Sequence, residues 1–148
     1  MLQMRLNALA MSAACALVGS LLPVGSLSAA DPTPQQLEFF EKKIRPVLST
    51  HCYKCHSRES KKLRAGLMLD SHAAVMRGGE SGALLVPGEP DKSRLIEAVR
   101  YENVDLEMPP KRKLPEDVIK DLTEWVRMGA PWPAEAAPAD AGVPAETF

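Results

Sequence analysis

The sequence predicts a small helical domain, and three observations lead to this prediction. Apolar residues recur at helical spacing in three stretches, around residues 37–48, 95–99 and 118–126. Prolines, glycines and charged residues mark the segments between these stretches. The first 30 residues have the features of an export signal, so 118 of the 148 residues remain, which is enough for one small domain.

The first predicted helix follows a polar, proline-containing lead over residues 31–36 and runs into a motif that contains two cysteines. Its apolar face is expected to hold Leu37, Phe40, Ile44, Val47 and Leu48. Pro46 lacks an amide hydrogen and clashes with the preceding turn, so it predicts a kink or a restart of this helix.

Two shorter helices are predicted in the middle of the chain. Ser71 can cap a helix that runs through Met76. Asp91 or Ser93 can cap the next helix. The buried stripe of that second helix is expected to be Leu95, Ile96 and Val99. The glycine-rich segment 78–82 predicts a turn and not a phosphate loop, because no Gly-Lys-Ser/Thr sequence follows it.

The last predicted helix begins near Pro115, which suits a first helical turn, and ends at Gly129. Its apolar face is expected to hold Val118, Ile119, Leu122, Trp125 and Val126. The chain then becomes rich in alanine and proline. We therefore place the domain at residues 31–132 and expect a disordered tail over residues 133–148.

The N-terminus predicts a signal peptide over residues 1–30. Arg5 precedes an apolar run from Ala8 to Val24, and cleavage is expected after Ala30. A membrane anchor is the weaker interpretation, because glycine and proline interrupt the run and it is short for a span. Without this segment the chain has 17 cationic and 19 acidic residues, a net charge of −2 with neutral histidine. Nothing in that charge favours a nucleic-acid partner.

The segment Cys52-Tyr53-Lys54-Cys55-His56 predicts covalent attachment of a c-type haem. Two cysteines three positions apart lie on one side of a helical turn, so both sulfurs can reach the vinyl groups of one porphyrin. The residue that follows, His56, is then the proximal iron ligand. Cys15 leaves with the signal peptide, so the exported chain keeps only the two cysteines of this motif.

Met108 is the predicted distal iron ligand. It begins the sequence Met108-Pro109-Pro110, and the two prolines stiffen the loop that presents it. Met76 and Met128 fall on predicted helices, where core packing is the usual role of methionine. Met68 is expected to contact the haem, and His72 is a less favoured candidate for the same iron position. His51 is expected to be a surface residue.

Two other interpretations of the cysteine motif compete with haem attachment. A zinc site normally has four ligands, and the motif supplies three, so His51 or His72 would have to complete the set. A thioredoxin-like redox pair normally follows a strand, whereas the predicted element before this motif is a helix.

The order of these motifs resembles class I cytochrome c, and within it the planctomycete-type cytochrome c domain. The resemblance covers about residues 37–132. It is carried by Phe39-Phe40…Ile44-Arg45-Pro46-Val47-Leu48, Cys52-x-x-Cys55-His56, Gly66-Leu67-Met68-Leu69-Asp70-Ser71, Gly78-Gly79-Glu80-Ser81-Gly82, Val86-Pro87-Gly88 and Met108-Pro109-Pro110…Leu114. It implies a small all-α fold around one covalently attached haem c per chain, with His56 and Met108 as axial ligands. It also implies that the first and last helices cross, and Phe40 and Trp125 are the expected contact. In that branch the domain often heads a much longer protein, so the resemblance does not define a pathway.

A closed six-coordinate iron favours one-electron transfer over oxygen or peroxide chemistry. We therefore expect an exported, periplasmic electron carrier and not an enzyme, with a transient redox protein partner and no stable membrane span. Lys111, Arg112 and Lys113 are candidate docking residues, although exposed charges of this kind are more often simply solvated. A peroxidase-like enzyme with a dissociable Met108 is the alternative, and a module that keeps haem only for structure is a third possibility.

Overall fold

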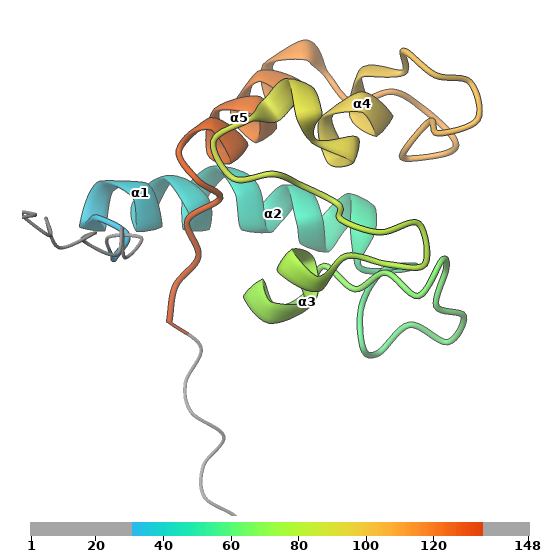
Figure 1. The fold of residues 1–148 in the computed structure, drawn as a ribbon, viewed down its shortest axis with the longest axis horizontal. Coiled ribbons are helices and arrows are strands. Elements are labelled where there is room, and N and C mark those ends of the chain that lie inside the picture. Colours follow the sequence, from blue (N-terminus) through green and yellow to red (C-terminus); the bar gives the residue numbers. More distant parts are fainter. Residues whose placement is uncertain (1–30, 135–148) are drawn as a thin grey trace, which may run out of the picture. The chain divides into compact units, whose positions relative to one another are not determined.

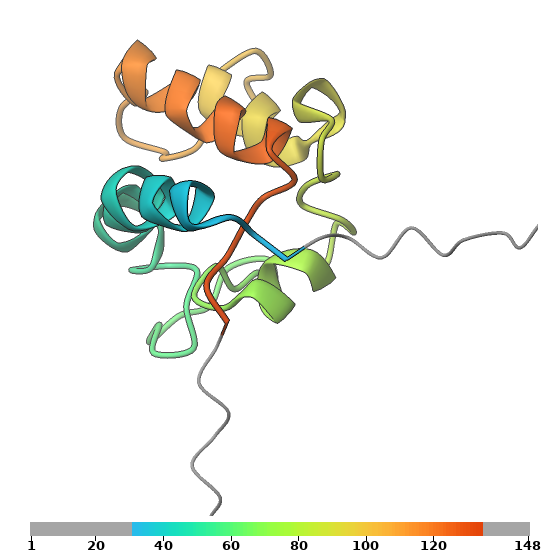
Figure 2. The same ribbon diagram turned by 90° about the vertical axis from the view of Figure 1, so that its left-hand side faces the viewer.

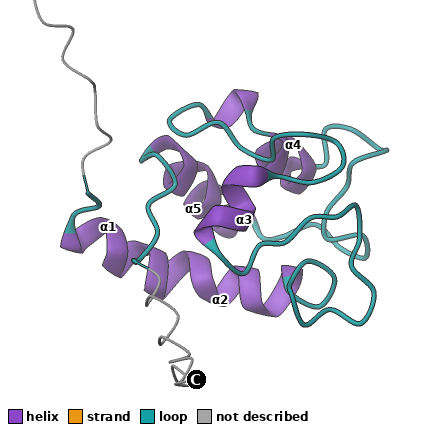
Figure 3. Ribbon diagram, turned by 60° about the horizontal axis from the view of Figure 1, so that its bottom comes forward, coloured by secondary structure: helices purple, strands orange, loops and turns teal. Residues whose placement is uncertain are grey.

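The structure, a computed structural model, describes residues 31–134. The chain divides into two units, Met1–Ala30 and Asp31–Phe148, and every described residue belongs to the second. The predicted signal peptide and residues 135–148 of the predicted tail therefore lie outside the described residues. Within residues 31–134 the regular structure is helical, apart from one isolated bridge between Gly79 and Gly82 (Figure 3). This confirms the all-α fold.

The helical elements, in chain order, are α1 (Pro34–Phe39), a π-helical segment (Phe40–Ile44), α2 (Arg45–Val47), a second π-helical segment (Leu48–Cys52), α3 (His72–Arg77), a 3-10 turn (Pro90–Lys92), α4 (Arg94–Arg100) and α5 (Glu116–Arg127). The first four elements join into one helix, here called the N-terminal helix (Figure 1). None of the helices in the described part of the chain is both long and apolar enough to span a membrane.

The N-terminal helix begins earlier than the sequence analysis predicted. The Thr33 hydroxyl accepts a hydrogen bond from the Gln36 amide at 3.3 Å, and the Gln36 side chain accepts one from the Thr33 amide at 2.8 Å. Pro34 occupies the first helical position, where its missing amide hydrogen costs nothing. The expected lead over residues 31–36 is therefore wrong from Pro34 onward, and the capping pair Thr33–Gln36 is the signal that was missed.

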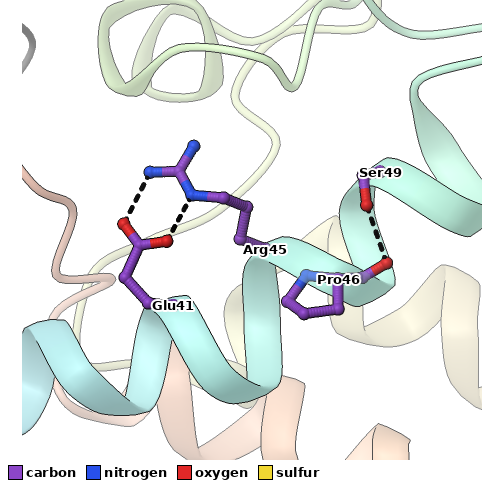
Figure 4. Close-up of polar contacts among 4 residues, drawn as sticks. All are labelled: Glu41, Arg45, Pro46 and Ser49. Atoms are coloured by element: carbon purple, nitrogen blue, oxygen red, sulfur yellow. Dashed lines mark hydrogen bonds and ion pairs between the residues drawn. The ribbon is translucent and has the colours of Figure 1, made fainter.

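Pro46 lies where the N-terminal helix restarts after a widened turn. The Arg45 amide donates to the Phe40 carbonyl, five residues back, so the turn just before the proline is π-helical. Such a turn accommodates the missing amide and the proline ring without ending the helix. Around it, the Arg45 guanidinium bonds both oxygens of Glu41 at 2.6 and 2.9 Å, and the Ser49 hydroxyl donates to the Pro46 carbonyl at 3.0 Å (Figure 4).

The core lies between the N-terminal helix, α4 and α5, and Figure 2 shows α4 and α5 above the N-terminal helix. Its largest fully buried side chains are Trp125, Phe40, Ile44, Leu48, Ile96, Leu122, Val75 and Val126. The Phe40 and Trp125 ring centroids are 6.0 Å apart, which confirms the predicted contact between the first and last helices. The apolar faces predicted for α4 and α5 are buried, except that Val118 is only partly so.

Trp132 joins this core from the segment after α5. Gly129 adopts φ +92° and turns the chain back, and the Trp125 indole donates to the Pro131 carbonyl at 2.8 Å. The ring centroids of Trp132 and Phe40 are 4.4 Å apart, and Trp132 is 6% exposed. Figure 2 shows this segment running past the N-terminal helix toward α3. The alanine- and proline-rich composition that begins at Pro131 therefore does not mark the end of the packed structure.

The helix starts in the middle of the chain follow the sequence analysis in part. Ser71 caps α3, because its hydroxyl accepts from the Ala74 amide at 3.2 Å. Ser93 precedes α4, but its hydroxyl bonds to the backbone of Val86 and Glu89 and not to the helix. The expectation that Met76 packs in the core is wrong. It is 39% exposed, because the residues of α3 that face the core are Ala74 and Val75.

Candidate functional site

The cysteine motif forms a single tight turn at the end of the N-terminal helix. Cys52 is the last residue of the second π-helical segment. The amides of Cys55 and His56 both donate to the Cys52 carbonyl, at 3.1 and 3.0 Å. The carbonyl at the helix end is thus satisfied by the motif itself, and the backbone of the two cysteines and the histidine is fixed in one turn.

His56 is held by a backbone oxygen in the way that suits a metal ligand. Its side chain is partly buried, and its Nδ1 lies 3.3 Å from the Leu67 carbonyl oxygen. The Leu69 amide donates to the His56 carbonyl at 2.8 Å, so the same segment holds both the ring and the backbone. A proton on Nδ1 that is donated to Leu67 leaves Nε2 as the nitrogen that can bind iron. The sequence could not reveal this partner, because any residue supplies a carbonyl.

The loop after the motif, residues 57–70, is fastened to the motif at several points. The hydroxyls of Ser57 and Ser60 both donate to the Tyr53 carbonyl, at 2.7 and 2.9 Å. The Arg64 amide donates to the Cys55 carbonyl at 3.2 Å. Farther along, the Asp70 carboxylate accepts from the Arg58 amide at 2.6 Å. The loop, here called the motif loop, therefore keeps the Leu67 carbonyl in place beside His56.

The two cysteines are free thiols in the described structure and do not form a disulfide. Burial raises the pKa of the Cys52 thiol to about 11, from its ordinary value of 9.0. Cys52 also packs against the apolar core. A neutral thiol in apolar surroundings is compatible with the apolar edge of a porphyrin.

Met108 lies in the loop between α4 and α5, residues 101–115, here called the Met108 loop. Its amide donates to the Ala98 carbonyl at 3.0 Å, while its side chain is 40% exposed. The backbone is thus anchored to α4 and the thioether is displayed. Figure 1 shows the motif loop and the Met108 loop toward the end of the N-terminal helix that carries the motif. Met68 is partly buried in the motif loop.

The rival ligand sets receive no support from the geometry. Among residues 31–134, no three side chains of histidine, cysteine, aspartate or glutamate converge to hold a metal ion, so the zinc hypothesis lacks a fourth and even a third converging ligand. A helix and not a strand precedes the motif, which disfavours the thioredoxin-like pair. His51 is exposed, as expected. His72 is exposed on α3, and its ring stacks 6.3 Å from that of Trp132.

The residues present therefore fit a covalently attached haem. The structure fixes the two cysteines in one turn, orients His56 with one ring nitrogen available, and exposes the side chain of Met108 from a separate, anchored loop.

The candidate docking residues, Lys111, Arg112 and Lys113, are exposed, and Lys113 forms an ion pair with Glu116 at 2.8 Å.

Comparison with known proteins agrees with this arrangement. The family model described as planctomycete cytochrome C matches residues 52–112, a span that begins at the first cysteine of the motif and includes Met108. Searches of the curated proteins and of the solved structures gave no match.

Proposed function

From the premise that residues 52–112 form a planctomycete-type cytochrome c domain, we propose that the chain is an exported mono-haem c-type cytochrome that transfers single electrons. The observation that carries the proposal is the motif turn with His56 held through Nδ1 by the Leu67 carbonyl, within the segment that the family model matches. The family alone supports a haem-binding electron carrier. One haem per chain, the ligand pair and export are the parts that we add.

Each residue of the site has a distinct role in this proposal. Cys52 and Cys55 would hold the porphyrin by thioether bonds, which would prevent its loss outside the cell. His56 would bind the iron through Nε2, and its hydrogen bond to the Leu67 carbonyl increases the basicity of the ring and fixes its orientation. Haem iron, when bound, supplies the one-electron change between Fe(III) and Fe(II).

Met108 completes the proposed iron site from the opposite loop. A thioether opposite a histidine favours the reduced iron and raises the potential. If His56 and Met108 both held the iron, a small oxidant would lack a place to bind, and electron transfer would be the function left. Because the Met108 backbone is anchored to Ala98, the loop holds this weak ligand at a low entropic cost.

The cellular context is also a proposal. The pattern of Arg5, the apolar run and Ala30 supports export to the periplasm or outside the cell. The partner is a redox protein that docks transiently near the haem edge, and the exposed residues Lys111 and Arg112 are available to it. The net charge of −2 without residues 1–30 gives no support to a nucleic-acid partner.

The experiment that tests the attachment is a pyridine haemochrome spectrum combined with the intact mass of protein matured by a haem-export system. We expect one haem per chain and no free thiols. A colourless protein, or one with both thiols free, contradicts the proposal.

The second measurement concerns the iron ligands. The oxidised protein should show the methionine–iron charge-transfer band, and Met108→Ala should abolish it, whereas Met68→Ala should keep it. A high-spin spectrum in the unmodified protein would instead support the peroxidase-like alternative with an open site. A band that persists in Met108→Ala rules out this residue as the ligand.

A further inference from the structure

The turn that presents Met108 is clamped to the end of α4 on both sides. On one side, the Met108 amide donates to the Ala98 carbonyl at 3.0 Å. On the other side, the Tyr101 hydroxyl donates to the carbonyl of Pro109. The two bonds enclose the Met108–Pro109 peptide, so the residue that carries the thioether cannot move away from α4 unless at least one of them breaks.

Tyr101 has the position that such a clamp requires. It follows α4 directly as its C-terminal cap and adopts φ +61°, a left-handed conformation that is uncommon for residues other than glycine. This conformation ends the helix and begins the Met108 loop. The residue is partly buried, and so is its hydrogen bond to Pro109. A tyrosine can thus bridge the first residue of the loop and the turn eight residues later.

The rest of the Met108 loop is held by a separate set of bonds. The Asn103 side chain donates to the Glu97 carboxylate at 3.0 Å and accepts from the Asp105 amide at 3.1 Å. These bonds order residues 103–105 and do not reach Met108 or Pro109. Val104 at this part of the loop is 82% exposed. Among the described side chains that bond within the loop, Tyr101 is thus the one that reaches the methionine turn.

We propose that Tyr101 is a positioning residue for the axial methionine, acting through its hydrogen bond to the Pro109 carbonyl. This inference rests on the proposed function, because it takes Met108 as the distal ligand. The bond adds to the free energy needed to swing the loop away, so it keeps the thioether on the iron against competing ligands. Tyr101 does not touch the iron, and its effect is on how readily Met108 leaves.

The test uses haem-loaded protein and exogenous imidazole, which competes with Met108 for the iron. Imidazole can bind only when the loop releases the methionine, so its apparent affinity reports the cost of opening. Tyr101→Phe keeps the ring and removes the hydroxyl. We expect it to bind imidazole about fivefold more tightly than the unmodified protein, the factor that corresponds to one neutral hydrogen bond. Its methionine–iron band in the absence of imidazole should remain.

Asn103→Ala is the matched control, because it removes two side-chain hydrogen bonds from the same loop without touching the methionine turn. We expect it to change the imidazole affinity by less than twofold. A Tyr101→Phe protein with unchanged affinity, or with no larger effect than Asn103→Ala, overturns the role of Tyr101. If Tyr101→Phe fails in this way while Met108→Ala abolishes the methionine–iron band, the role of Tyr101 is wrong and the assignment of Met108 as the ligand stands. A band that survives in Met108→Ala overturns the ligand assignment and the role of Tyr101 together.

Discussion

Replacing Trp132 by alanine should destabilise the protein strongly, although this residue comes after the last helix. Trp132 is 6% exposed, and its ring centroid lies 4.4 Å from that of Phe40 and 6.2 Å from that of Trp125. A tryptophan in such a position removes about 150–250 Å² from water. At about 25 cal/mol per Å² this burial amounts to about 4–6 kcal/mol, of which alanine keeps a small part. We expect a loss of about 3–5 kcal/mol, the usual range for removing a core tryptophan.

The assay is guanidinium unfolding of the haem-loaded protein at fixed pH, followed by far-ultraviolet circular dichroism. The loss is read from the shift of the midpoint at an unchanged slope. Trp132→Phe should lose less than Trp132→Ala, because an aromatic ring next to Phe40 is kept. Val104→Ala is the matched control, since Val104 is 82% exposed and its truncation should change stability by less than about 0.5 kcal/mol.

A loss below about 1 kcal/mol for Trp132→Ala would refute this reasoning. It would mean that the segment after α5 adds little to the core and that the structured domain ends near Gly129. The magnitude matters because a domain of this size is expected to have only about 5–15 kcal/mol of total stability.

Two further predictions concern the motif. In the haem-free chain, the raised pKa of Cys52, about 11, makes the thiol react slowly with iodoacetamide at pH 8 and faster with each pH unit up to about 11, which mass spectrometry can follow. The raised pKa of Cys52 also contributes to the stability of the folded chain below pH 9, and this contribution is lost as the pH rises to about 11. A rate of reaction with iodoacetamide that already levels off near pH 9 would contradict the burial of this thiol. Tyr53→Phe should leave the stability unchanged or raise it by up to about 1 kcal/mol, because the buried Tyr53 hydroxyl has no hydrogen-bond partner among the described residues. A loss of more than about 1 kcal/mol on guanidinium unfolding would show that the hydroxyl has a partner in the haem-loaded protein.

The sequence was most informative where side-chain chemistry and spacing both act locally. The apolar stripes of α4 and α5 follow from helical periodicity, and the Ser71 cap from the preference of a hydroxyl for exposed amides. The contact between Phe40 and Trp125 was predicted from the resemblance to cytochrome c, and the structure shows it. Periodicity alone could not pair these two residues, because it does not say which helices cross.

The sequence was least informative where the backbone supplies the contact. The Leu67 carbonyl that contacts His56 and the Ala98 carbonyl that accepts from the Met108 amide are backbone groups, so no residue type in the sequence marks them. The π-helical turns before Pro46 and Cys52 are of the same kind, since hydrogen bonds of a longer span define them and not the residue types. Trp132 was difficult for another reason, because its alanine- and proline-rich neighbours resemble a disordered segment.

These two classes of contact together explain how a site of this kind can be assembled on so small a domain. In the proposed site, the motif supplies the groups that would bind the haem, and a local turn is enough to arrange Cys52, Cys55 and His56. Met108, the proposed distal ligand, comes from about 50 residues later in the chain, where no local rule can place it. Its position depends on α4 through Ala98 and Tyr101, and α4 is in turn fixed by the core that Phe40 shares with α5. A weakened core should therefore loosen Met108 before it affects His56. In the Trp132→Ala protein, the methionine–iron band should be lost at a lower guanidinium concentration than the helical signal, and a simultaneous loss of both would show that the Met108 loop does not open separately.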